Sequence, residues 1–302
     1  MINFIVNLVL ISLLFPGGFN FLISQSESYS YAYPAPQIDG PNRIINNSLG
    51  IVTTAKSVLA VDDKSGQILF AKNRHISSPI ASITKLMTVL VFLDNNPGWD
   101  QEIVLFREDK KEGGKIYLMT GEKVTVKNLF NLTLVASSNE AAAALARSTG
   151  LDDFVAKMNI KAEELGMVGA EFFDATGLDS RNIASPTDLV KLTKVCFENQ
   201  EILAATTSSA YDFPVLNNGR LVKAENTDKL LDSFLNSDDY EILAAKTGYL
   251  DESGYCLVIK IKKIGQASIT LVLLGSNSQS DRWQEAKGVI DWVFGNYQWA
   301  EN

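Results

Sequence analysis

The amino-acid sequence predicts an α+β fold in which helices flank one antiparallel sheet. Three observations support this prediction. Residues 57–73 have the pattern of a β-hairpin, helical patterns occupy most of residues 82–199, and three apolar strand patterns follow one another between residues 241 and 276. Strands from the two ends of a domain can share one sheet, and the helices between them can pack against it.

Local signals locate the elements in order. Two apolar runs around Asp-Lys-Ser-Gly indicate the first hairpin. The helix over residues 185–199 has Ser185 as N-cap and Pro186 at its first position, where these residue types are favoured. The remaining expected elements are helices that begin at Ser82 and near residues 126, 140 and 151, a short strand at 102–106, strands at 241–249, 254–263 and 266–276, and a last helix within 280–298.

Composition limits the classes of function. The chain has 302 residues, is 46% hydrophobic, and carries a net charge of −8 with a pI near 4.9. An acidic chain lacks the basic surface that non-specific nucleic-acid binding requires, so no nucleic-acid partner is expected. With one histidine and two cysteines, most Cys/His zinc sites and a disulfide scaffold are excluded. We expect Cys196 and Cys256 to be buried free thiols, and we predict no metal site.

The first 24 residues contain no charged side chain, which is typical of an export signal or a membrane anchor. The segment lacks Lys and Arg at its start, and no Ala-x-Ala cleavage site follows. Cleavage and retention as an anchor therefore both stay open, and a buried N-terminal helix is a third interpretation. Residues 25–50 read as a linker, and residues 51–302 as the folded domain.

Three short motifs carry candidate chemistry: Ser82-Ile83-Thr84-Lys85, Ser137-Ser138-Asn139 and Lys246-Thr247-Gly248. Positions i and i+3 share a helix face, so the Lys85 amine can meet the Ser82 hydroxyl and act as its base. Each motif alone is common by chance and also fits a solvated surface. A Ser-His-Asp triad would depend on His75, which lies in no recognisable motif.

Taken together, the motifs resemble those of the low-molecular-mass penicillin-binding proteins, the serine D-Ala-D-Ala carboxypeptidases of peptidase family S11 and their endopeptidase relatives. The blocks "PIASITKLMT", "YLMTGEKVTVKNLFNLTLVASSNEAAAALA", "FVAKMNIKAEELGM" and "AAKTGYLDESGYCLV" have family order, and the resemblance covers about residues 51–297. It implies the penicillin-binding-protein/β-lactamase-like transpeptidase fold with an all-helical subdomain, in a short single-domain form. Ser138 departs from the glycine usual in the middle motif.

The resemblance implies acyl transfer through an acyl-enzyme on Ser82. Lys85 would be the base, and burial together with the nearby cation Lys246 would lower its pKa. Ser137 would relay a proton to the leaving amine. The backbone N–H groups of Ser82 and Tyr249 would form the oxyanion hole.

The resemblance also assigns the binding residues. Asn139 would hold Lys85 and the substrate amide, while Lys246 and Thr247 would bind the carboxylate beside the scissile bond. Gly248 would let the strand approach the substrate backbone closely. No cofactor is implied.

The implied substrates are peptidoglycan stem peptides that end in D-Ala or are cross-linked through it, and penicillins would be covalent inhibitors. The enzyme would work in cell-wall biogenesis outside the cytoplasm, on the membrane if the N-terminal segment is retained. Three alternatives remain: a serine β-lactamase, a non-catalytic cell-wall binding module, and an esterase. The stretch "FFDATGLDSRN" at 172–182 lacks the Glu that activates the deacylating water in class A β-lactamases.

Overall fold

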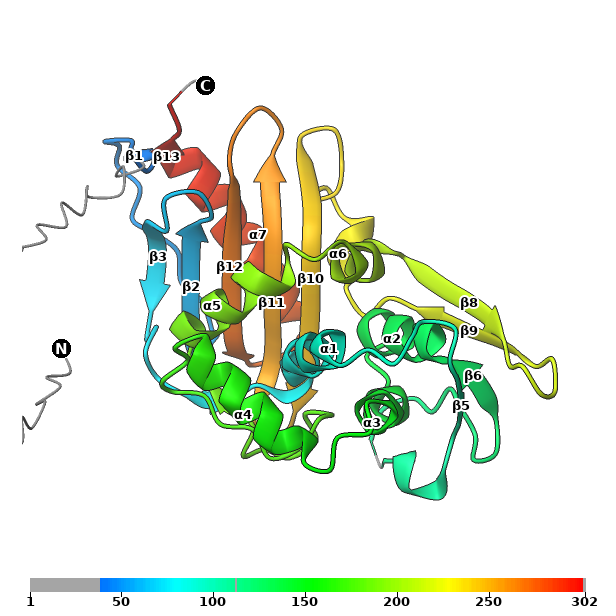
Figure 1. Cartoon of the computed structure of the whole chain (residues 1–302). Coiled ribbons are helices and arrows are strands. Elements are labelled where there is room, and N and C mark those ends of the chain that lie inside the picture. Colours follow the sequence, from blue (N-terminus) through cyan, green and yellow to red (C-terminus); the bar gives the residue numbers. More distant parts are fainter. Residues whose placement is uncertain (1–38, 112, 301–302) are drawn as a thin grey trace, which may run out of the picture. The chain divides into compact units, whose positions relative to one another are not determined.

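The structure is a computed structural model that describes residues 39–111 and 113–300 (Figure 1). The predicted export signal or anchor at 1–24, and the linker up to residue 38, lie outside these residues. Within the described ranges, no helix is both long and apolar enough to cross a membrane.

The predicted helices and strands occur in the expected order in the described chain, with further elements between them. The helices are α1 (Thr84–Asp94), α2 (Val126–Val135), α3 (Asn139–Ser148), α4 (Phe154–Glu164), α5 (Pro186–Cys196), α6 (Gln200–Thr207) and α7 (Gln279–Asn296), with 3₁₀ turns η1 (Ala81–Ile83), η2 (Arg107–Asp109) and η3 (Lys229–Asp232). The strands are β1 (Asn42–Arg43), β2 (Ser57–Asp62), β3 (Ile68–Lys72), β4 (Ser78–Pro79), β5 (Glu102–Val104), β6 (Lys123–Thr125), β7 (Ile183–Ala184), β8 (Ala210–Pro214), β9 (Leu221–Glu225), β10 (Tyr240–Leu250), β11 (Gly254–Lys263), β12 (Ser268–Ser276) and β13 (Tyr297–Gln298).

The central sheet has five antiparallel strands in the order β10-β11-β12-β2-β3 (Figure 1). The N-terminal hairpin therefore joins the C-terminal strands by pairing β2 with β12. This arrangement confirms the predicted α+β class, with first and last strands in one sheet.

Each face of the sheet belongs to a different hydrophobic core. Leu271 and Leu273 of β12 lie in the core under α7, whereas Val272 and Leu274 lie in the core on the other face. Successive side chains of a strand point to opposite faces, so the unbroken apolar run of β12 fits a strand that is covered on both sides. The C-terminal helix packs on the sheet as predicted, through Val289, Ile290, Val293 and Phe294.

The part of the chain expected to be all-helical also contains strands. Two antiparallel pairs, β5-β6 and β8-β9, accompany α2 and α3 (Figure 1). The pair β8-β9 and helix α6 were missing from the sequence-based interpretation. Segment 215–220 closes the β8-β9 hairpin, with the Val215 N–H donating to the Arg220 oxygen at 2.9 Å.

The folded part begins before residue 51. Residues 42–43 form β1 and pair with β13, and the Ile44 N–H donates to the Asn296 oxygen at 2.8 Å. Trp292 of α7 donates to Ser48 Oγ at 2.7 Å. The C-terminal end of the expected linker is thus held on α7 by hydrogen bonds that no local sequence pattern indicates.

Replacing Leu271 by Ala should lower the free energy of unfolding by about 2–5 kcal/mol, because a buried side chain leaves a cavity. Leu271 is 0% exposed, and Leu49, at 102%, is a matched control. Leu49→Ala should change the free energy by less than about 0.5 kcal/mol. Urea denaturation followed by circular dichroism measures both, and equal losses would contradict the assignment of this core.

Candidate active site

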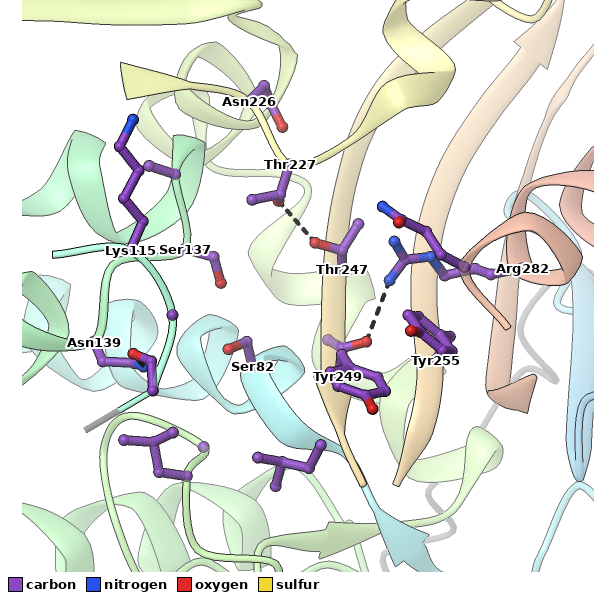
Figure 2. Close-up of a pocket in the computed structure, with 18 of the residues that line it drawn as sticks. Ser82, Lys115, Ser137, Asn139, Asn226, Thr227, Thr247, Tyr249, Tyr255 and Arg282 are labelled. Atoms are coloured by element: carbon purple, nitrogen blue, oxygen red, sulfur yellow. Dashed lines mark hydrogen bonds between the residues drawn. The ribbon is translucent and has the colours of Figure 1, made fainter. Parts of the chain in front are cut away.

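A cleft of about 880 Å³ lies between β10 and the helical region. Six of the eight predicted site residues line it: Ser82, Ser137, Asn139, Thr247, Gly248 and Tyr249. Figure 2 shows Ser82 between Ser137 and Asn139 on one side and residues of β10 on the other. The other two, Lys85 and Lys246, are buried and form hydrogen bonds to Ser82 and Ser137.

Ser82 lies in the 3₁₀ turn η1, directly before α1, and not in the α-helix that the sequence suggests. The preceding residue, Ala81, has a φ of 47°, which a non-glycine residue rarely adopts. Two glycines pack against this turn. A Cβ on Gly177 would lie 2.2 Å from the Ala81 oxygen, and one on Gly248 would lie 2.8 Å from the Ile80 oxygen.

Lys85 is fully buried and has three hydrogen-bond acceptors. Its Nζ lies 2.9 Å from Ser82 Oγ, 2.7 Å from Asn139 Oδ1 and 2.6 Å from the backbone oxygen of Thr176. The i, i+3 contact of Ser82 with Lys85 therefore forms as the sequence predicts. Burial lowers the pKa of Lys85 to about 7, against the opposing effect of the Asp174 and Glu140 charges.

Two of these acceptors are held in place by neighbouring segments. Asn139 Nδ2 donates to the Gly113 oxygen at 2.9 Å, which fixes the orientation of its amide. The loop that presents the Thr176 oxygen is organised by Asp174. The Asp174 carboxylate accepts from the Thr176 hydroxyl, from the Gly177 N–H at 2.8 Å and from Asn182 Nδ2 at 2.7 Å.

The middle motif lies in the break between α2 and α3. Ser137 has a φ of 56°, so its side chain is presented by a left-handed backbone conformation. Ser138 is the N-cap of α3, and its Oγ accepts from the Ala141 N–H at 3.1 Å. The serine at position 138 therefore has a structural role as the cap of α3.

Lys246 forms the second buried lysine contact. Its Nζ donates to Ser137 Oγ at 2.7 Å and to the Thr247 oxygen at 2.9 Å. Burial, and then the positive charge of Lys85, lower the pKa of Lys246 well below its ordinary value. The Lys246 charge is not among the causes of the lowered pKa of Lys85, contrary to the prediction from the sequence; the repulsion acts on Lys246 instead.

The rest of β10 shapes the opposite wall. Thr247 Oγ1 donates to Thr227 Oγ1 at 2.7 Å. Gly248 lies against the Ser82 turn, where a Cβ would collide with backbone atoms. This contact is a reason for glycine that is separate from the predicted close approach to substrate. The Tyr249 ring stacks on Tyr255 at 4.3 Å between centroids, and its hydroxyl donates to Asp251 at 2.6 Å.

Sequence reasoning missed Arg282, which also lines the cleft. It lies in the first turn of α7, and its Nη1 donates to the Gly248 oxygen at 3.2 Å (Figure 2). The same Nη1 donates to the Cys256 oxygen at 3.3 Å. Its guanidinium lies over the Trp283 ring at 3.9 Å. No short motif marks this position, because its contacts are distant in the sequence.

The cysteines and the histidine lie as the sequence suggests. Cys196 and Cys256 are both buried and free. Burial raises the pKa of both thiols, so neither is a reactive nucleophile. His75 is exposed and accepts a hydrogen bond from Arg74 at 2.9 Å, outside the cleft.

Comparison with known proteins identifies the family to which this chain is similar. The profile of the D-alanyl-D-alanine carboxypeptidase family, peptidase S11, matches residues 47–278. A D-alanyl-D-alanine endopeptidase of Haemophilus influenzae is 34% identical over 78% of this chain and 81% of its own length. The D-alanyl-D-alanine carboxypeptidase DacF of Bacillus subtilis is 30% identical over 81% of this chain and 63% of its own.

Solved structures with a similar fold support the same family. Penicillin-binding protein D2 from Listeria monocytogenes, in a cefotaxime-bound form, is 28% identical with a TM-score of 0.70, covering 82% of this chain and all of that one. The Streptomyces K15 DD-transpeptidase is 25% identical with a TM-score of 0.73, covering 81% of this chain and 98% of that one. The profile match and the fold together establish that this chain belongs to the D-alanyl-D-alanine carboxypeptidase family, peptidase family S11.

Proposed function

We propose that this serine peptidase is a DD-peptidase that acts on peptidoglycan stem peptides, removing a terminal D-Ala or cutting a D-Ala cross-link through an acyl-enzyme on Ser82. The observation that carries the proposal is the pair of buried lysines, Lys85 and Lys246, each bonded to a serine of the same cleft. The relatives named D-alanyl-D-alanine endopeptidase and carboxypeptidase support this substrate class.

The contacts of Lys85 suit a general base. A neutral amine has two N–H groups and one lone pair, whereas an ammonium has three N–H groups. The two N–H groups match Asn139 Oδ1 and the Thr176 oxygen, and the lone pair then faces the Ser82 hydroxyl. As Ser82 Oγ attacks the substrate carbonyl carbon, its proton passes to Lys85 Nζ.

The second serine is placed to serve the leaving amine. Ser137 Oγ accepts a hydrogen bond from Lys246 Nζ, so its own proton is available to a group in the cleft. When the C–N bond breaks, Ser137 can relay to the departing nitrogen the proton that Lys85 took from Ser82, so that Lys246 keeps its charge. Lys246 then orients the Ser137 hydroxyl on the leaving-group side.

The substrate carboxylate has donors on β10. Thr247 supplies a hydroxyl and Arg282 a cation at the cleft wall, and Lys246, buried beside Ser137, would supply a second cation. Charge-assisted hydrogen bonds to a carboxylate are roughly twice as strong as neutral ones. A peptide with a free carboxylate beside the scissile bond therefore suits this wall.

The oxyanion of the tetrahedral intermediate would be held by two backbone N–H groups, those of Ser82 and Tyr249. Gly248 controls their separation, because its Cα side lies against the Ser82 turn. A Cβ at position 248 would lie 3.1 Å from the Ser82 nitrogen. Such preorganised donors are commonly worth about 3–4 kcal/mol of transition-state stabilisation each.

The serine β-lactamase alternative lacks a base for deacylation. Asp174 is the carboxylate of the 172–182 stretch that acts most strongly on Lys85. Its two oxygens are engaged by Thr176, Gly177 and Asn182, so it has no geometry for activating a water. We expect the penicilloyl-enzyme on Ser82 to be long-lived.

The site of action follows from the same proposal. The family acts on the cell wall, which is consistent with work outside the cytoplasm. We propose that residues 1–24 direct export, as a cleaved signal or a retained anchor, and that the domain following the linker contains the catalytic site. Penicillins and peptidoglycan peptides are the proposed ligands.

Ser82→Ala should abolish covalent labelling by a fluorescent penicillin, because it removes the nucleophile. The label is followed on a denaturing gel, and mass spectrometry locates the adduct. Ser237→Ala, at an exposed serine, should label like the wild type. Hydrolysis of the drug with rapid loss of label would favour the β-lactamase, and a folded protein without label would favour the non-catalytic module. A stem pentapeptide and a cross-linked dimer then separate carboxypeptidase from endopeptidase.

The rate of acylation should fall about tenfold for each pH unit below about 7. The pKa of Lys85 is about 7, so acid converts it to the ammonium that cannot accept the Ser82 proton. The second-order labelling rate, measured from about pH 5.5 to about pH 8.5, tests this. Lys85→Arg should abolish labelling, whereas Lys157→Arg, at an exposed position of α4, should not. A flat profile would argue against Lys85 as base.

Gly248→Ala should slow labelling by about tenfold to a hundredfold, because the added methyl displaces the Ser82 turn from β10. Gly295→Ala is the matched control, since a Cβ there meets no atom within 4 Å. Near-ultraviolet circular dichroism verifies that both variants are folded. Unchanged labelling of a folded Gly248→Ala protein would show that this contact does not set the oxyanion geometry.

A further inference from the structure

Two buried charged side chains beside β10 each have an atom without a hydrogen-bond partner. Among the described residues these are Asp228 Oδ2 and Arg282 Nε, and both side chains are at most 4% exposed. Figure 2 shows Thr227, which precedes Asp228, on one side of Thr247 and Arg282 on the other. An unpartnered buried charge is costly, so its retention at a site calls for a role.

The position of Asp228 is fixed by its neighbours. The Thr227 N–H donates to the Val135 oxygen at 3.1 Å, and Thr227 Oγ1 accepts from Thr247 at 2.7 Å. The Asp228 N–H donates to Asn226 Oδ1 at 2.8 Å. Asp228 Oδ1 accepts from the Leu230 N–H at 3.0 Å, which caps η3. Capping uses one carboxylate oxygen and no charge, so it does not explain an aspartate here.

The charges around Asp228 come from three elements. Lys246 of β10 and Arg282 of α7 are cations that favour its ionised form, and Asp232 of η3 opposes it. In return, Asp228 favours the charged form of Lys246, and it adds to the larger effect of Cys256 in favouring the charged form of Arg282. Lys85 and Arg282 have the opposite effect on Lys246, because their positive charges lower its pKa.

We propose that Asp228 is a positioning residue for substrate binding, whose buried carboxylate keeps Lys246 positively charged in the empty cleft so that it can receive the substrate carboxylate. The inference rests on the proposed function, in which Lys246 binds that carboxylate. It adds that the binding cation depends on a residue that does not touch the substrate.

The ionisation of Asp228 is consistent with this role at neutral pH. Burial raises the pKa of Asp228 to about 6, so the carboxylate is mostly ionised at pH 7. Above pH 7 Lys85 is mostly neutral, so removing the Asp228 charge leaves Lys246 beside the Arg282 cation without a counter-charge. The pKa of Lys246 should then fall further. As the pH rises, Lys246 in such a variant should lose its charge at a lower pH than in the wild type.

The test uses two variants of the full chain. Asp228→Asn removes the charge, and Asp228→Ser also removes it but keeps an oxygen that can cap η3. Asp232→Asn is the control, because it neutralises an exposed carboxylate four residues away on the same turn. Circular dichroism verifies folding.

Two substrates separate carboxylate binding from acylation. Both are thioesters of the same acyl-D-Ala group. One has thioglycolate as leaving group and carries a carboxylate, and the other has its methyl ester and is neutral. The release of thiol gives kcat/KM for each as a function of pH.

In both Asp228 variants, we expect the alkaline limb of kcat/KM for the carboxylate substrate to move down by about one pH unit. The change should lie in KM, and the neutral substrate and Asp232→Asn should show no shift. An unshifted limb, or the same shift with both substrates, would overturn the proposal. A wild-type enzyme without preference for the carboxylate substrate would instead overturn the role of Lys246 itself, and this inference with it.

Discussion

The burial of two lysine amines within one cleft is the constraint on which the rest of the site depends. Removing an ammonium from water costs several kcal/mol unless polar groups replace the water. Lys85 meets this demand with three acceptors from three different segments, and Lys246 with two. The proposed base must lose a proton near neutral pH, and burial leaves the amine of Lys85 easier to deprotonate.

The fold supplies these acceptors by bringing distant segments together at β10 and α1. The sheet fixes β10, apolar contacts in the core fix α1, and the loop ordered by Asp174 reaches Lys85 from a third direction. Two glycines, Gly177 and Gly248, let backbone contact backbone around Ser82. Main-chain contacts, which have little rotational freedom to lose, therefore hold the turn that carries Ser82.

The sequence was informative where a function is encoded in a short interval and silent where it depends on remote contacts. The Ser82 to Lys85 spacing and the strand that carries Lys246 were both predicted, because helical and strand periodicity are local. Arg282 has no local signature, since its acceptors lie 26 and 34 residues away. Asp228 reads as an ordinary loop aspartate until the structure shows its burial. The β8-β9 pair was missed although Asn-Asn-Gly precedes its second strand.

The tight backbone contacts around Ser82 also bear on how such an enzyme can diversify. Every mutation of Gly177 adds a Cβ 2.2 Å from the Ala81 oxygen, so that position offers no neutral step to an evolving lineage. The rim of the cleft is different. Lys115 and Glu252 are exposed there and can be exchanged without moving the reacting groups. New substrate preferences, or reduced drug sensitivity, should therefore arise first at the rim, while the floor stays invariant.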